Sequence, residues 1–168
     1  RCSRDWSSDV CSSDLSAALP AMRWVQFANR QRCRRVDTRA LSALALDVLG
    51  ALERTGEVGF HLVGQREMAA VNWQFLRHEG STDVITFDHG STAARLHGEI
   101  FISVPDAVAQ AEEFGTSWPE ELGRYVVHGL LHLAGEDDLE PAARRRMKRR
   151  ENQLVQRWVR GRVRAIGG

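Results

Sequence analysis

The strongest constraint on the fold is a pair of histidines, His128 and His132, in an apolar stretch of the chain. Residues four apart in an α-helix lie one turn from each other on the same face, so both imidazoles can reach one metal ion without any tertiary contact. Gly135 follows, and glycine suits the left-handed turn that ends many helices. Asp138 comes three residues later, where a carboxylate can complete a set of three ligands. The pattern predicts a metal site of His128, His132 and Asp138.

The residues around this pair predict a helix with two different faces. Ser117 and Glu120 have the spacing of a capping box, with Pro119 in the first turn. An apolar stripe at helical spacing is expected to face the core: Leu122, Val126, Leu130, Leu133 and Ala134. A polar row follows the other side: Glu121, Arg124, His128 and His132. Two histidines at this spacing are more often ordinary surface or core residues, but the glycine turn and the acidic residues after it favour metal binding.

The ligand types indicate zinc and hydrolytic chemistry. Three protein ligands leave one position on zinc for a water molecule, whose pKa falls to about 7 and which can then attack a phosphodiester or an amide. Zinc peptidases carry a glutamate base directly after the first histidine, where this chain has Gly129. Glu136 or Asp137 could replace that base, although Asp137 and Glu140 also have the spacing of a capping box. A zinc metallopeptidase-like hydrolase therefore stays open as the second interpretation.

Three ordered blocks between residues 24 and 158 resemble the family of YbeY-type bacterial rRNA-maturation endoribonucleases. They are HGLLHLAG at 128–135 with Met147 and Glu151 after it, STDVITFD at 81–88 with Asn72, Phe75 and His78 before it, and GEIFIS at 98–103. The family usually has a third histidine ligand where this chain has Asp138. Some of its branches combine an aspartate at that position with the sequence TDIITFD, so the two departures occur together.

This resemblance implies a zinc-dependent endoribonuclease that cuts single-stranded RNA with metal-activated water. It implies one zinc ion on His128, His132 and Asp138, and a role in 16S rRNA maturation and ribosome quality control. RNA and the small ribosomal subunit are the expected partners, and DNA is not expected. The family also has a functional arginine shortly before its TDV segment. Leu76 holds the aligned position here, and Arg77 directly after it is the candidate catalytic cation, or equally a solvated charge at a helix end. A ribosome-associated module with structural zinc and no catalysis is the third interpretation.

The C-terminal part of the chain is strongly cationic, although the net charge of the whole chain is only +1. Its basic residues are Arg144, Arg145, Arg146, Lys148, Arg149, Arg150, Arg157, Arg160, Arg162 and Arg164. Such a run is usually a solvated helix face. Here it follows the metal site directly, which favours contact with RNA phosphates, and Arg145, Arg149 and Arg150 are the candidates. Few aromatic residues lie near this run in the sequence, so binding through the RNA backbone is expected rather than base-specific recognition.

The alternation of apolar patterns predicts one α+β domain, a small mixed β-sheet packed with about five helices. Strands are expected at 23–31, 57–62, 84–87 and 98–103. Helices are expected from the cap at Asp37 or Thr38 to Gly56, over 65–77 with Met68, Val71, Phe75 and Leu76 buried, from Pro105 to Gly115, around His128, and from Leu139 onward. Membrane contact is not expected, because no run of about 18 apolar residues occurs.

The first fifteen residues differ in character from the rest. They are rich in serine and aspartate, without apolar periodicity and without the pattern of a secretory signal. The run DWSSDVCSSDL at 5–15 resembles the translation of a common sequencing-library adapter. We expect residues 1–15 to be a non-native, disordered segment and residues 16–168 to be the single endoribonuclease domain. The cysteines form no disulfide framework, so a cytoplasmic location is expected.

Overall fold

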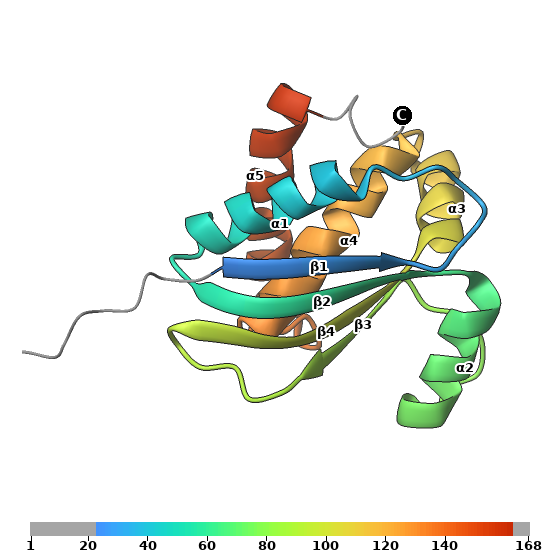
Figure 1. The fold of residues 1–168 in the computed structure, drawn as a ribbon, viewed down its shortest axis with the longest axis horizontal. Coiled ribbons are helices and arrows are strands. Elements are labelled where there is room, and N and C mark those ends of the chain that lie inside the picture. The colour runs from blue at the N-terminus through green and yellow to red at the C-terminus, as the bar shows by residue number, and fades with distance from the viewer. Residues whose placement is uncertain (1–22, 163–168) are drawn as a thin grey trace, which may run out of the picture.

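A mixed four-stranded β-sheet forms the centre of the molecule in the computed structural model, which describes residues 23–162 (Figure 1). The strands are β1 (Arg23–Asn29), β2 (Thr55–Val63), β3 (Val84–Asp88) and β4 (Arg95–Ser103). Their order in the sheet is β1-β2-β4-β3. Strands β1, β2 and β4 run parallel, and β3 pairs antiparallel with β4 as an edge strand. The expected α+β class and mixed sheet are thus confirmed, whereas the adapter-like residues 1–15 lie outside the described residues.

Within residues 23–162, five helices accompany the sheet, as expected. They are α1 (Thr38–Ala51), α2 (Gln65–Leu76), α3 (Val104–Phe114), α4 (Trp118–Leu133) and α5 (Pro141–Arg162). Helices α1 and α4 pack against the sheet, α5 packs on α4 and α1, and α2 projects beyond the ends of the parallel strands (Figure 1). In the part of the chain that the structure describes, no helix combines the length and apolar character needed to cross a membrane.

The core lies between the sheet and the helices α1, α4 and α5. Strands β2 and β4 alternate between buried and partly exposed residues, so that Phe60, Leu62, Ile100 and Ile102 are buried. The expected apolar stripe of α4 is buried as well, apart from the partly exposed Ala134. Gly129 is required at the contact of α4 with the sheet, because a Cβ atom there would lie 2.6 Å from Cγ2 of Ile100. This close approach fixes α4, and with it both histidines, against β4.

Three local expectations were wrong. Helix α1 begins at the predicted cap, where the Asp37 carboxylate accepts hydrogen bonds from two backbone N–H groups, but it ends at Ala51, and Gly56 belongs to β2. Ser117 occupies the N-cap position of α4 without any side-chain capping bond, so the predicted capping box does not form. Phe75 and Leu76 at the end of α2 are not buried: 57% and 48% of their surfaces are exposed.

Candidate metal centre

Helix α4 and the loop after it bring together the three residues expected to bind metal. The Nε2 atoms of His128 and His132 lie 3.0 Å apart, and the ring planes are perpendicular. An Asp138 carboxylate oxygen lies 3.9 Å from Nε2 of His132. One candidate ligand atom from each residue lies within 4.8 Å of the others. Gly135 has φ +88°, the left-handed conformation expected where the chain turns back from the helix. These three residues are called the His–His–Asp group below.

The outer nitrogens of both imidazoles have fixed partners. Nδ1 of His128 lies 3.0 Å from a carboxylate oxygen of Glu151, and Nδ1 of His132 lies 3.0 Å from the backbone carbonyl oxygen of Glu136. Both partners are acceptors, so each Nδ1 carries the proton and donates it. In the neutral rings the two Nε2 atoms are then unprotonated, and their lone pairs face each other at 3.0 Å. A metal cation between them turns this repulsion into attraction, so the arrangement fits metal binding.

The spacing of the donor atoms also fits a small divalent metal. With zinc–nitrogen bonds of about 2.0–2.1 Å, ligand atoms of a tetrahedral site lie about 3.3 Å apart. The separations of 3.0 and 3.9 Å within the His–His–Asp group lie on either side of this value. All three residues are partly exposed, which leaves access from solvent. Two imidazoles and one carboxylate are a donor set that zinc accepts with a further position left open.

Glu151 on α5 is the residue that orients His128. Its side chain is only 5% exposed, and its two oxygens are shared between the Nδ1–H of His128 and the Arg124 guanidinium, with Lys148 Nζ 3.6 Å away. Burial raises the pKa of Glu151, but the hydrogen bonds from His128 and Arg124 outweigh it, so the pKa lies below its ordinary value. The carboxylate is therefore ionised at neutral pH. Carboxylate–histidine pairs of this kind fix the tautomer of metal-binding histidines.

The sequence offered only an indirect signal for Glu151. It was part of the family resemblance, and it is the single acidic residue of α5, a helix otherwise crowded with arginines. Its neighbour Met147 is buried one turn earlier on the same face. The partner of Glu151 could not be identified without knowing how α5 packs on α4.

The acidic residues considered as general bases both have structural partners. The Glu136 carboxylate forms an ion pair with Arg150, and its backbone carbonyl holds His132. Asp137 accepts a hydrogen bond from the backbone N–H of Leu139, so it points towards the start of α5 as expected, but not through a capping box with Glu140. The position of the peptidase glutamate, Gly129, faces β4, where any larger side chain would collide with Ile100.

The three arginines of α5 expected to contact RNA do not share one side of the helix. Arg146 and Arg150 line a hollow of about 370 Å³ together with the loop residues 135–137. Arg145 and Arg149, also exposed, fall on the side opposite the buried row of Met147 and Glu151, because residues in a helix advance by about 100° each. Arg150 thus lies against the loop between His132 and Asp138, where it pairs with Glu136. Arg146 was not among the residues that the sequence indicated for RNA contact. The available signal was its spacing of four residues from Arg150, which places both on one side of the helix.

Arg77 lies at the end of α2, where it is the left-handed C-cap residue with φ 58°. Its guanidinium group lies 5.9 Å from the ring centroid of Trp73. It is exposed, and it is not among the residues that line the hollow beside His132, whereas Leu76 is. A catalytic role for Arg77 stays a prediction.

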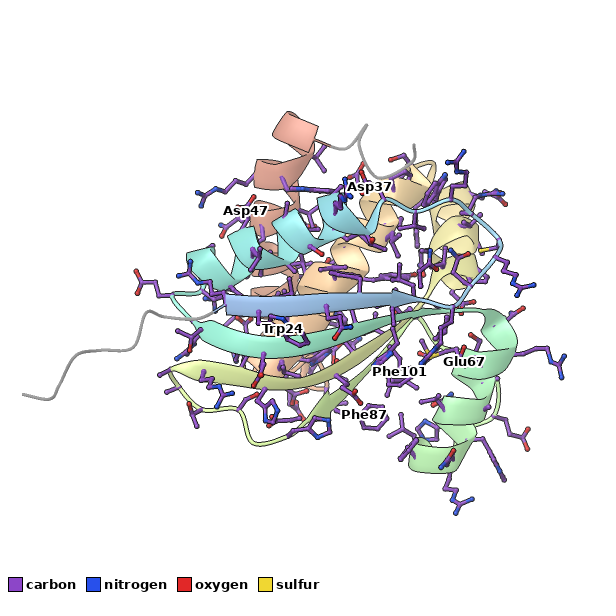
Figure 2. All side chains as sticks on the ribbon, in the orientation of Figure 1. Trp24, Asp37, Asp47, Glu67, Phe87 and Phe101 are labelled. Atoms are coloured by element: carbon purple, nitrogen blue, oxygen red, sulfur yellow. The ribbon has the colours of Figure 1, made fainter. Side chains whose placement is uncertain are left out.

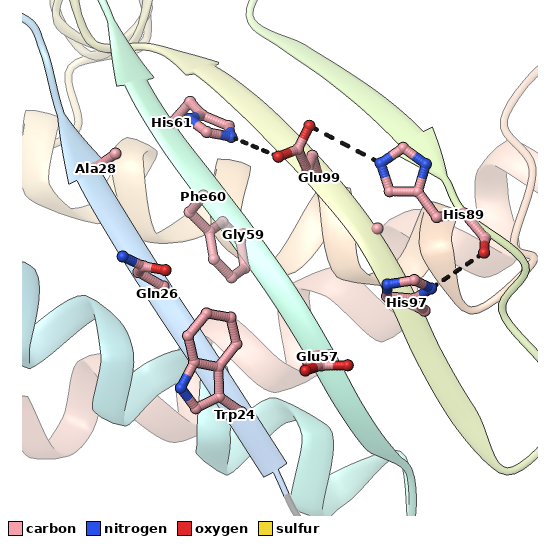
Figure 3. A pocket seen from close by; sticks show the side chains of 11 residues that line it. Trp24, Gln26, Ala28, Glu57, Gly59, Phe60, His61, His89, His97 and Glu99 are labelled. Carbon is pink, nitrogen blue, oxygen red and sulfur yellow. Dashed lines mark hydrogen bonds and ion pairs between the residues drawn. The ribbon is translucent and has the colours of Figure 1, made fainter.

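Other histidines form a separate cluster on the open face of the sheet. Figure 3 shows His61 and His89 on either side of Glu99, at 3.3 and 3.8 Å from its carboxylate oxygens. Nδ1 of His97 lies 3.1 Å from the backbone carbonyl of His89. This cluster lines a hollow of about 370 Å³ with Trp24. His89 makes its contacts within this cluster and not at the His–His–Asp group.

Comparison with known proteins assigns the chain to a family. The family described as Endoribonuclease YbeY matches residues 26–159. Endoribonuclease YbeY of Bacteroides thetaiotaomicron is 39% identical over 103 residues, which are 61% of this chain and 74% of that protein. The protein of the same name from Chlorobium luteolum is 32% identical over 136 residues, 81% of this chain and 98% of the relative. The solution structure of TM1509 from Thermotoga maritima shares the fold, with a TM-score of 0.58 at 23% identity over 84% of this chain and 95% of that one. This chain belongs to the endoribonuclease YbeY family.

Proposed function

We propose that the protein is a zinc-dependent endoribonuclease that cuts single-stranded RNA. The observation that carries this proposal is the pair of facing Nε2 atoms of His128 and His132, completed by the Asp138 carboxylate, in a chain of an endoribonuclease family. Zinc, when bound, supplies Lewis-acid activation of a water molecule near neutral pH. Three ligands from the protein suit that role better than the closed set of four found in structural zinc sites.

The surrounding residues have distinct roles in this proposal. Glu151 and the Glu136 carbonyl hold the two imidazoles in the tautomer that presents Nε2 to the metal. Arg150, with Arg146 beside it, places positive charge next to the loop of Asp138, where a phosphate of the RNA strand can be held. The ion pair of Arg150 with Glu136 fixes this guanidinium group near the site.

The exposed arginines of α5 extend the same basic surface away from the His–His–Asp group. Arg145 and Arg149 lie one helical turn apart on the outer side of α5. Contacts of this kind bind the RNA backbone without reading its sequence. We further propose that the substrate is ribosomal RNA, in 16S rRNA maturation and ribosome quality control in the cytoplasm. This part of the proposal rests on the family resemblance alone.

A circular single-stranded RNA tests the activity, because a circle has no end and only an endonuclease opens it. We expect the purified protein with zinc to linearise the circle, a metal chelator to stop the reaction, and added zinc to restore it. A duplex of the same sequence should be cut much more slowly. Failure to open the circle with zinc bound at one equivalent would overturn the proposed activity, and opening it equally well in chelator would overturn the metal dependence.

A further inference from the structure

A hollow of about 450 Å³ opens directly beside His132. One wall is the last turn of α2, with Phe75 and Leu76, and the floor is the edge strand β3, with Thr86 and Phe87. His132 of the His–His–Asp group forms part of its lining, so a strand of RNA bound at the metal group would pass this hollow. It is called the apolar hollow below.

The exposed side chains of this wall are unusual for a helix end. Phe75 and Leu76 leave about half of their surfaces exposed, against the expectation that both are buried. The Phe75 and Phe87 rings contact each other edge to face, with their centroids 4.9 Å apart. The Phe87 and Phe101 rings have the same arrangement, with their centroids 5.6 Å apart. Figure 2 labels Phe87 and Phe101 at the end of the sheet near α2. The Phe75 ring is therefore held in place by an aromatic cluster while much of its surface stays open to a ligand.

The charges around the apolar hollow select against a phosphate group. Its lining, all within the described part of the chain, contains no lysine or arginine, and its one acidic side chain is the exposed Asp88. The Thr86 hydroxyl is buried and has no hydrogen-bond partner among the described residues. An apolar wall without cationic groups suits the apolar face of a flat ring. The cationic groups Arg146 and Arg150 lie instead in the separate hollow beside the loop of Asp138.

We propose that the apolar hollow is a nucleobase subsite, in which Phe75 stacks on one unpaired base of the RNA strand next to the phosphate held at the His–His–Asp group. This inference rests on the proposed function and names the part of the substrate that is recognised. A base in a duplex is stacked on both faces and paired along one edge, so only an unpaired base can enter the apolar hollow. The hollow thereby supplies a structural reason for a preference for single strands.

Binding measured without cleavage tests this subsite. The dissociation constant of a fluorescently labelled single-stranded RNA hexamer is measured in chelator for the native protein, Phe75→Ala, Phe75→Tyr and Trp73→Ala. Trp73 is the matched control, because it is a similarly exposed aromatic residue of α2 that does not line the apolar hollow. We expect Phe75→Ala to weaken binding by about 5- to 150-fold, the range for loss of one base–aromatic stack. Phe75→Tyr should bind like the native protein, and Trp73→Ala should change little.

A second set of hexamers distinguishes stacking from a general loss of affinity. An abasic residue is introduced at each position of the hexamer in turn. When it replaces the nucleotide whose base stacks on Phe75, the native protein and Phe75→Ala should bind that hexamer with equal affinity. The slope of log affinity against log salt should be unchanged in Phe75→Ala, because no phosphate contact is lost. Equal affinity of Phe75→Ala and native protein for the intact hexamer, or an equal loss in Trp73→Ala, would overturn the subsite. Native protein that binds in this pattern but leaves circular RNA intact with zinc bound would overturn the nuclease activity and support the subsite.

Discussion

Replacing Glu151 with glutamine tests the link between α5 and the metal ligands. Glutamine keeps the size and shape of the side chain but removes the charge and turns one acceptor into a donor. In the native protein one oxygen of Glu151 accepts from Arg124 at 2.8 Å and the other from His128 Nδ1 at 3.0 Å. The amide can satisfy only one of these two donors. If the amide NH2 group faces Arg124, two donors oppose each other. If the NH2 group faces His128, Nδ1 must accept its hydrogen bond, and the proton of that ring moves from Nδ1 to Nε2.

The structure indicates the size of both effects. With the proton on Nε2, His128 has no lone pair for the metal, so zinc affinity should fall by about 10- to 100-fold, the usual cost of losing such a supporting contact. If the amide opposes Arg124 instead, one buried donor is left unsatisfied, which costs about 1–3 kcal/mol of stability. Glu151 is 5% exposed, so water does not relieve the conflict.

Zinc affinity is measured by competition with a chromophoric chelator, and the protonated nitrogen of His128 by ¹⁵N NMR of the metal-free protein. Asn152→Ala is the control, because the Asn152 side chain also accepts from Arg124, at 2.7 Å, but does not contact His128. Asn152→Ala should keep the native zinc affinity. Native zinc affinity in Glu151→Gln, or an equal loss in Asn152→Ala, would refute the positioning role of Glu151.

Three further predictions concern the third ligand, the basic surface and the response to acid. Asp138→Asn should bind zinc much more weakly in chelator competition, while Asp138→His should retain it. Unchanged zinc affinity in Asp138→Asn would show that Asp138 is not a ligand. Changing Arg145, Arg149 and Arg150 together to glutamine should lower the slope of log affinity against log salt by about 2 for single-stranded RNA, and an unchanged slope would show a merely solvated helix face. The pKa of Glu151 is lower in the folded protein than in the unfolded chain. The ionised carboxylate therefore stabilises the metal-free protein fully at pH values above the pKa of the unfolded chain. This stabilisation is lost as the pH falls through the pKa of the folded protein. Urea unfolding between neutral and acid pH should therefore show a smaller loss of stability in Glu151→Gln than in native protein, and parallel losses would contradict this.

Local patterns in the sequence were sufficient to predict the helix that carries the candidate metal ligands. The spacing of His128 and His132 and the glycine turn at Gly135 depend only on helix geometry, and the structure brings both histidines together with Asp138 as expected. The helix class of the surrounding segments also follows from local periodicity. These features need no knowledge of distant contacts.

Features that depend on packing could not be predicted in the same way. The pattern of α2 was read as a buried apolar face, yet Phe75 and Leu76 border an open hollow, and apolar spacing cannot distinguish a core from a binding surface. The predicted capping box at Ser117 does not form, and the hydroxyl beside it, that of Thr116, donates a hydrogen bond to the Glu121 carboxylate. Glu151 acquires its role only when α5 lies against α4.

Metal content and metal-dependent cleavage, measured on the same preparations, test the central claim most directly. The native protein should hold one zinc ion per chain and cut single-stranded RNA, and His128→Ala and His132→Ala should each lose both properties, because each removes one of only three protein ligands. Circular dichroism should show that both variants stay folded, since the two histidines are partly exposed. Full zinc retention by either folded variant, or cleavage by native protein stripped of metal, would contradict the account.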